Sequence, residues 1–314
     1  MSLSSRTKKA ELQGRVVRAK SASFDGLEAT ARQKSAKGCF FERGPHRKEK
    51  KIAKWLRLYE ESEFDFGEFA VEQVQIAPER DTCADGCKDP SCKDSSLFDA
   101  AAVESRIREA SGHLVANLPS SFRGDVQADA ESIASMCARL CPGVPFITFR
   151  LEIVQYNACW RWHQDAYVGR AIVSYVGPGT CTTDDHSVQW KKFDETGDTN
   201  EGCVPQKLIK QMSTNSVLLM KGDSWPNICG NGLVHKSPKL SGDQPPKRLI
   251  LKVDLNYFGP PLGLDEGSDV SEDDATIEQE DDFREGNNAS ALALKRLASS
   301  EGFKSSNAWK LRRR

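Results

Sequence analysis

Residues 147–153 read Ile-Thr-Phe-Arg-Leu-Glu-Ile, a strict alternation of apolar and polar side chains. Successive side chains on a β-strand point to opposite faces, so this run predicts a strand that is buried on one face. Further strands are predicted over 170–176, 216–220 and 248–257, separated by Gly/Pro turns such as 177–179. The second half of the chain is therefore predicted to consist of short strands.

Helical periodicity dominates before residue 144. Helices are predicted over 51–59, 97–118 and 125–140, with Asp125 as the cap of the third, and 66–76 is a further strand candidate. The predicted fold class is mostly β with supporting α. Its core is a double-stranded β-helix of the jelly-roll or cupin-like kind, backed by N-terminal helices. In its last strand Leu249, Leu251, Val253 and Leu255 should face the helices, while Arg248 and Ile250 face the barrel interior.

Charge is segregated along the 314 residues, although the net charge is only −1. The start of the chain is rich in Lys and Arg, the stretch from Asp265 to Glu285 is acidic, and the last three residues are arginines. Such blocks usually form solvated, disordered segments. We therefore expect the following organisation: a basic disordered arm over 1–50, one folded domain over 51–258 (helical support 51–143, double-stranded β-helix 144–258), and a disordered tail over 259–314.

Composition indicates the class of protein and its compartment. With 38% hydrophobic and 28% charged residues, a soluble protein of one or at most two domains is expected. No apolar stretch approaches the roughly 18 residues of a membrane span, and the start lacks the apolar segment of a secretory signal. We expect an intracellular protein of the cytoplasm or nucleus, without membrane contact. The basic start also suits organelle import, and the charged tails suit contact with nucleic acid or protein.

A candidate metal site is formed by His163-Gln164-Asp165, followed much later by His235 and then by Arg248. In an extended strand His163 and Asp165 point the same way and Gln164 points away. Two imidazoles and one carboxylate are the ligand set that holds Fe(II) on one face and leaves the other positions open. The motif is therefore typical of an iron oxygenase.

The order of Tyr156, His163-x-Asp165, Gly222-Asp223, His235 and Arg248 resembles the Fe(II)/2-oxoglutarate-dependent dioxygenase superfamily. More narrowly, four segments are similar to an uncharacterised family known only as a domain of unknown function. These are Trp162-His163-Gln164-Asp165, Tyr175-Val176-Gly177-Pro178-Gly179-Thr180, Met220-Lys221-Gly222-Asp223 and His235-Lys236-Ser237-Pro238. The resemblance covers roughly residues 145–258.

The resemblance implies a role for each residue of the motif. His163, Asp165 and His235 would bind iron, and Arg248 would bind the distal carboxylate of 2-oxoglutarate, which its planar guanidinium matches. Tyr156 is a candidate for a second contact to that carboxylate, with Arg170 as its competitor. The implied cofactors are Fe(II) and 2-oxoglutarate. The implied reaction uses dioxygen to hydroxylate or demethylate a substrate that the sequence does not identify, with formation of succinate.

Other interpretations remain open at this point. His163 and Asp165 also suit a local hydrogen-bonded pair, His235 a surface turn, and Arg248 a solvated strand start. A cupin-like metalloprotein could use the same ligands with zinc or manganese and without 2-oxoglutarate. A non-catalytic module that binds partners through its charged tails is the third class.

Two further features could contribute. Cys83, Cys87 and Cys92 are either reduced thiols or part of a structural zinc site, with Cys39, Cys137 or Cys141 as the fourth ligand. The segment 181–214 is either an idle loop or an insertion that overhangs the cavity, and it contains His186, which we expect in a loop.

Overall fold

Two β-sheets form the centre of the structure, a computed structural model that describes residues 14–59, 68–77, 99–155, 159–195, 200–226, 228, 231–240 and 246–257. All of these residues belong to one unit, Met1–Pro261. Within them the larger sheet has seven strands. In spatial order these are β1 (Arg15–Arg18), β2 (Ala36–Phe41), β8 (Val217–Lys221), β5 (Gly169–Val176), β10 (Arg248–Asn256), β4 (Phe146–Val154) and β3 (Glu68–Gln75).

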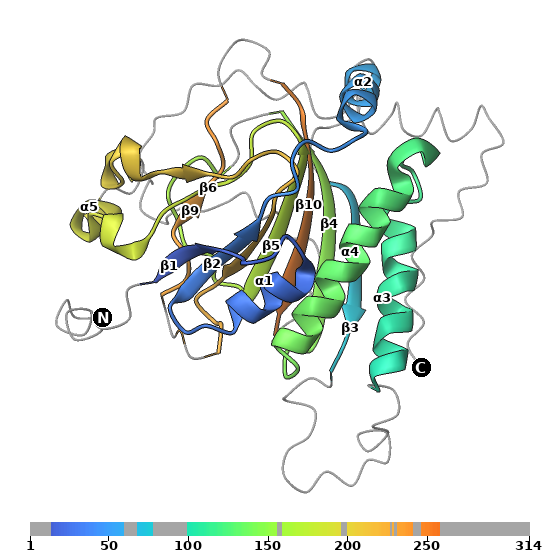
Figure 1. The fold of residues 1–314 in the computed structure, drawn as a ribbon, viewed down its shortest axis with the longest axis horizontal. Helices are drawn as coiled ribbons and strands as arrows, with labels where there is room; N and C mark the ends of the chain where they lie inside the picture. Colours follow the sequence, from blue (N-terminus) through green and yellow to red (C-terminus); the bar gives the residue numbers. More distant parts are fainter. Residues whose placement is uncertain are drawn as a thin grey trace, which may run out of the picture. The chain divides into compact units, whose positions relative to one another are not determined.

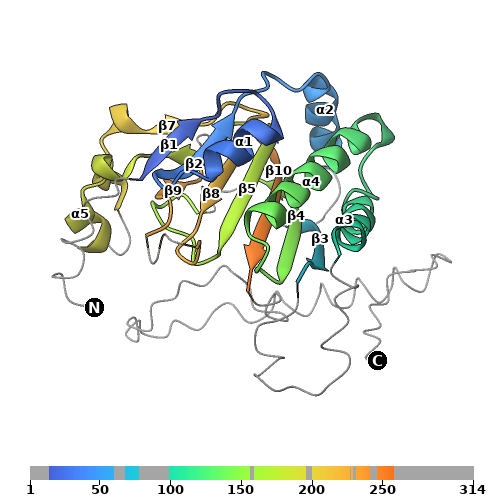
Figure 2. The ribbon, with the colours of Figure 1, turned by 60° about the horizontal axis from the view of Figure 1, so that its bottom comes forward.

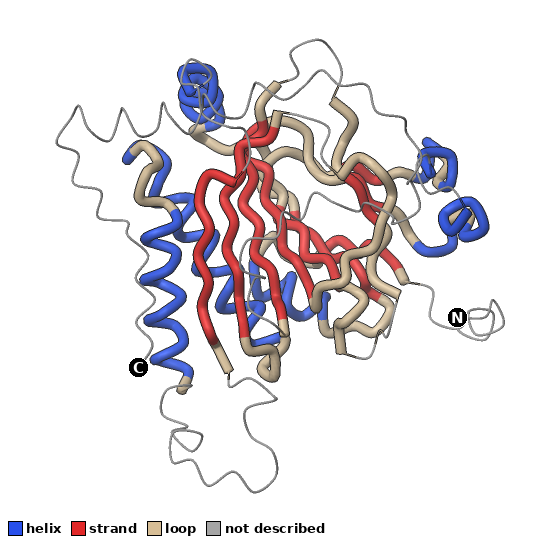
Figure 3. Tube along the Cα trace, turned by 180° about the vertical axis from the view of Figure 1, so that it is seen from behind, coloured by secondary structure: helices blue, strands red, loops and turns tan. Residues whose placement is uncertain are grey.

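The smaller sheet contains β7 (Lys210–Gln211), β6 (Cys181–Thr182) and β9 (His235–Lys236), in that order. It covers the β5 and β8 part of the larger sheet, since Met212 and Leu233 pack with Ile172 and Leu218 in one buried cluster. Figure 3 shows the smaller sheet and its loops in front of this part of the larger one. The predicted fold class, mostly β with supporting helices, is thus confirmed, and the two facing sheets are consistent with the predicted double-stranded β-helix core.

The helices α1 (Phe24–Ala31), α3 (Ala100–Leu114) and α4 (Ser120–Leu140) cover the opposite face of the larger sheet (Figures 1 and 2). Buried residues recur at helical spacing along α4, as in Val126, Ala130, Ile133 and Cys137. The shorter α2 (Glu49–Tyr59) buries Ile52 and Leu56. One apolar cluster joins these helices to the outer face of the sheet.

The side chains of the central strand β10 point alternately toward the helices and toward the space between the two sheets. Leu249, Leu251, Val253 and Leu255 lie in the cluster shared with the helices, whereas Ile250 lies in the cluster between the sheets. This confirms the predicted orientation of the strand. Neighbouring layers cover both faces of β10, so seven of its nine residues are buried and only Lys252 and Asn256 are partly exposed.

The prediction of a disordered arm over 1–50 is wrong for residues 14–50. This segment supplies β1, α1 and β2, and begins α2. The segment is rich in basic residues but contains a few apolar residues that are buried in the core, such as Val16, Leu27 and Phe41. β2 pairs in antiparallel register with β8, so the segment completes the larger sheet.

Two helix boundaries also differ from the prediction. The helix α4 begins at Ser120, and Asp125 therefore lies inside it instead of capping it. The Asp125 carboxylate pairs with Arg47 at 2.8 Å and Lys48 at 2.9 Å. Asp99 caps α3 by accepting a hydrogen bond from the Ala102 amide at 2.7 Å, which starts this helix later than predicted.

The segment 181–214 is part of the fold rather than an insertion. It contains β6, β7, the short helix α5 (Trp190–Glu195) and three 3-10 turns, and His186 lies in one of these turns, Asp185–Ser187. Cys83, Cys87, Cys92 and the predicted tail 259–314 lie outside the described residues. No helix among those described has the length and apolar character needed to cross a membrane.

Candidate metal centre

The backbone brings His163 and His235 side by side. They form a β-bridge in which each amide donates to the other's carbonyl at 3.0 Å. His235 lies in β9, which pairs on its other side with Thr182 in β6. The bridge therefore places His163 at the edge of the smaller sheet, next to β9. One ligand atom from each of His163, Asp165 and His235 lies within 4.8 Å of the others. The three residues singled out in the sequence therefore converge.

The two imidazoles are oriented by their backbone surroundings. Nδ1 of His163 lies 2.8 Å from the Arg161 carbonyl oxygen, and Nδ1 of His235 lies 3.0 Å from that of Leu233. A carbonyl only accepts hydrogen bonds, so each Nδ1 is the donor and each Nε2 is the ring nitrogen left for a metal. The Nε2 atoms face Asp165, at 3.7 Å for His163 and 3.5 Å for His235. This donor set fits a divalent transition metal.

The protonation states of the buried groups suit metal binding as well. Burial lowers the pKa of His235 to about 4, against the opposing effect of Asp165, so its ring is neutral at physiological pH. Burial by itself would raise the pKa of Asp165, but the charge of Arg170, followed by His235 and His163, brings it to about 2. A neutral imidazole and an ionised carboxylate are the forms that bind a metal.

The geometry of the loop depends on the Gly222-Asp223 pair noted in the sequence. The Asp223 amide donates to the Asp165 carbonyl at 2.9 Å, and a Cβ on Gly222 would lie 2.0 Å from the Tyr167 carbonyl oxygen. Gln164 points away from the histidines and donates to the Gly232 carbonyl at 2.7 Å. These bonds tie the segment that carries His163 and Asp165 to the segment that leads into His235.

Arg170, in β5, is engaged by carboxylates of the chain. Its Nε and Nη2 donate to the two oxygens of Asp254 at 2.6 and 3.0 Å, and its Nη1 lies 3.3 Å from Asp165. The Tyr167 ring lies against its guanidinium at 4.6 Å. Arg170 is thus close to the metal ligands, but its donors are directed at Asp165 and Asp254. Its competitor Tyr156 lies outside the described residues.

Arg248 is 1% exposed and lies on the inner face of β10. Its Nη2 donates a long hydrogen bond of 3.4 Å to Ser174, and its Nε has no hydrogen-bond partner. Burial lowers its pKa from 12.5 to about 10. No ion pair joins Arg248 to a carboxylate in the described part of the chain, and the charge of Glu152 offsets only part of the effect of burial.

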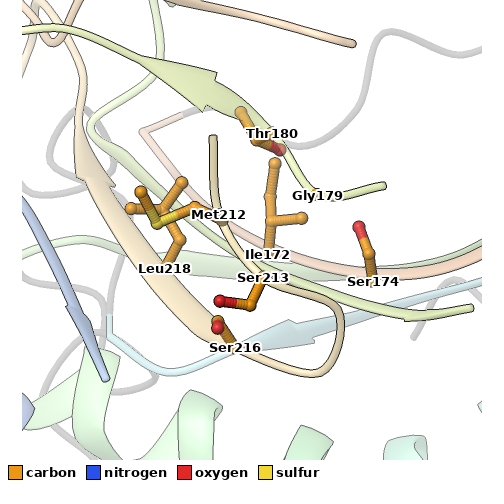
Figure 4. A pocket seen from close by; sticks show the side chains of 8 residues that line it. All are labelled: Ile172, Ser174, Gly179, Thr180, Met212, Ser213, Ser216 and Leu218. Carbon is orange, nitrogen blue, oxygen red and sulfur yellow. The ribbon is translucent and has the colours of Figure 1, made fainter. Parts of the chain in front are cut away.

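Ser174 also lines a small cavity between the two sheets. Figure 4 shows its walls, which are formed by Ile172, Ser174 and Leu218 from the larger sheet, Ser216 immediately before β8, and Gly179, Thr180, Met212 and Ser213 from the side of the smaller sheet. Four of these residues carry hydroxyl groups, which can bind an anion as donors. The cavity therefore combines apolar walls with polar groups beside Arg248.

The described residues contain no second cluster of three metal-binding side chains. Cys39, Cys137 and Cys141, considered as zinc ligands, are free and buried in the core. Burial raises the pKa of the Cys39 thiol to about 12. These three cysteines are therefore core residues held as thiols.

Comparison with known proteins gives a family. A family model described as "Protein of unknown function (DUF1826)" matches residues 68–254. The chain belongs to the DUF1826 family. No curated protein matches the sequence of this DUF1826 member.

Three solved structures illustrate a distant likeness to the chain. The dioxygenase for auxin oxidation 1 from Arabidopsis thaliana, as a 2-oxoglutarate binary complex, has 12% identity and a TM-score of 0.39, covering 77% of the DUF1826 chain and 92% of its own. A Pseudomonas putida prolyl-4-hydroxylase has 9% identity and a TM-score of 0.35, with coverages of 74% and 100%. Full-length Neurospora crassa T7H with alpha-KG has 11% identity and a TM-score of 0.34, with coverages of 74% and 79%.

Proposed function

We propose that this protein is an Fe(II)/2-oxoglutarate-dependent oxygenase that hydroxylates or demethylates its substrate. His163, Asp165 and His235 would hold the iron, and Arg248 would hold the distal carboxylate of 2-oxoglutarate. Ferrous iron with 2-oxoglutarate and dioxygen would supply the oxidising chemistry. The contribution of the chain is to bind, orient and shield these groups.

The observation that carries this proposal is the buried Arg248. A buried charge is expensive unless it is paired, and among the described residues Arg248 makes one long hydrogen bond and no ion pair with a carboxylate. A ligand carboxylate would supply two parallel hydrogen bonds and an opposite charge. The hydroxyl of Ser174 lies beside the guanidinium and lines the cavity, which favours this position for the carboxylate.

The position of Arg248 also favours this function over a cupin-like metalloprotein without 2-oxoglutarate. A cupin-like metalloprotein needs the three metal ligands, but it has no ligand carboxylate that a buried arginine would bind. A solvent-facing Arg248 would have suited it, whereas the observed side chain is on the inner face of β10.

The direct test is an anaerobic titration of the full chain with Fe(II) and 2-oxoglutarate. Bound 2-oxoglutarate should produce a visible charge-transfer band, and subsequent exposure to air should yield succinate. His163→Ala and Asp165→Ala should lose both signals because each removes a ligand. His186→Ala is the matched control, since this histidine is exposed and outside the cluster. An Asp165→Ala variant that keeps the band would contradict the assignment.

A further inference from the structure

We infer that Arg170 is a positioning residue that fixes the orientation of the Asp165 carboxylate at the metal centre. The inference rests on the proposed metal site, but it does not depend on 2-oxoglutarate. The guanidinium Nη1 lies 3.3 Å from Oδ2 of Asp165, whereas Oδ1 of Asp165 faces Nε2 of His163 at 3.7 Å. Oδ2 also lies 3.5 Å from Nε2 of His235, so the Arg170 contact keeps Oδ2 on the His235 side of the carboxylate and Oδ1 on the His163 side.

The position of Arg170 is itself fixed by the larger sheet. Arg170 in β5 and Asp254 in β10 are direct cross-strand partners, and Asp254 accepts two hydrogen bonds from the guanidinium. Asp254 is 0% exposed and lies 3.6 Å from the Arg150 guanidinium. The rigid anchor therefore comes from two central strands, while Asp165 lies in the segment between β4 and β5.

This arrangement controls how the carboxylate can bind a metal. A carboxylate that rotates freely can ligate through either oxygen or through both. An arginine donor on Oδ2 restricts this rotation and would present the carboxylate to a metal in one orientation, with one oxygen facing each imidazole. Lysine cannot reproduce the contact, because a single ammonium group lacks the planar fork that reaches Asp254 and Asp165 together.

Cobalt(II) binding to the metal-free full chain tests the inference. The visible absorption of bound Co(II) reports the ligand geometry, and titration calorimetry gives its Kd. Arg170→Met and Arg170→Lys are both expected to shift the absorption bands and to weaken binding by about 10- to 100-fold, as for other residues that orient a ligand. Asp254→Asn should act in the same direction with a smaller effect, since it loosens only the anchor.

Arg43→Met is the matched control. Arg43 also forks a buried aspartate, with Nη2 donating to Asp129 at 2.9 Å, but this pair lies among the residues that contact Tyr175 and α4, away from the metal ligands. The Arg43→Met variant loses a comparable ion pair and should keep the Co(II) spectrum and the Kd of the unaltered protein. Far-UV circular dichroism identifies the Arg170 variant that remains folded for the comparison.

The outcomes separate this inference from the proposed function. If the unaltered protein fails to bind Co(II), the metal site itself is wrong. If it binds Co(II) and folded Arg170→Lys does so with the same spectrum and Kd, only the role of Arg170 is overturned. An equal spectral change in Arg43→Met would likewise overturn it, because the effect would then follow from any loss of stability.

Discussion

Replacing Arg248 by Met should have opposite effects on the free protein and on its complex with 2-oxoglutarate. Met keeps an unbranched apolar side chain in the space of the arginine stem and removes the charge. The ligand-free protein should become more stable, because an unpaired buried charge is removed. Binding of 2-oxoglutarate should be lost, because the partner of its carboxylate is removed.

The structure sets the magnitudes. A pKa lowered by burial from 12.5 to about 10 corresponds to a cost of about 3 kcal/mol for keeping the guanidinium charged in the fold. The weak bond to Ser174 offsets part of this cost, so we expect a stabilisation of about 1–3 kcal/mol. Loss of one partner of a buried charge pair costs about 2–5 kcal/mol in binding, or about 30-fold to several-thousand-fold in Kd.

Two assays measure the two effects. Urea unfolding of the metal-free protein gives the free energy of unfolding, and fluorescence or calorimetric titration in the presence of Mn(II) gives the Kd for 2-oxoglutarate. Arg170→Met provides the contrast, since that arginine has carboxylate partners and its removal should lower stability. An Arg248→Met variant that unfolds more easily and still binds 2-oxoglutarate at the original Kd would refute the reasoning.

Three further predictions concern stability. Burial lowers the pKa of His235 from 6.5 to about 4, so the unfolded chain binds more protons than the folded chain between these pH values. The free energy of unfolding should therefore fall by at most about 3 kcal/mol as pH falls from 6.5 to 4. Urea unfolding without metal should show a smaller fall for His235→Gln. Gly222→Ala should lower stability by about 1–3 kcal/mol and weaken Co(II) binding, because its Cβ would collide with the Tyr167 carbonyl; equal stability and Kd would count against this. Leu251→Ala, in the fully buried face of β10, should cost about 2–5 kcal/mol in urea unfolding, and a cost below 1 kcal/mol would argue against the observed packing.

The strands with a clear two-residue period were accessible from sequence. The run at 147–153 lies within β4 (Phe146–Val154), and the last predicted strand matches β10 (Arg248–Asn256) closely. In both strands one face packs against the helices, so apolar residues recur at every second position of the sequence. Local pattern is sufficient for such elements.

The N-terminal strands were not accessible in this way. β1 contains two valines between arginines, and β2 includes Lys37, whose charge is compensated by Asp185 at 2.6 Å. These two residues are far apart in the sequence, so the burial of the lysine depends on the tertiary fold. A basic stretch with few apolar positions therefore resembled a solvated arm.

The convergence of His163, Asp165 and His235 was predicted from their order and types. The engagement of Arg170 was not, because it depends on the register that places Asp254 opposite it in β10. Strand register is a property of the assembled sheet, and a single residue of slippage would place Asp254 on the other face.

The pairing of β2 with β8 determines where the chain can be shortened. The family match begins at residue 68, so a fragment cut there would lack β1, α1 and β2. It would leave the wholly buried strand Val217–Lys221 as a bare sheet edge, open to pairing with another copy. Recombinant fragments designed on the family boundaries should therefore aggregate, whereas those that begin at or before Gly14 should stay monodisperse in size-exclusion chromatography.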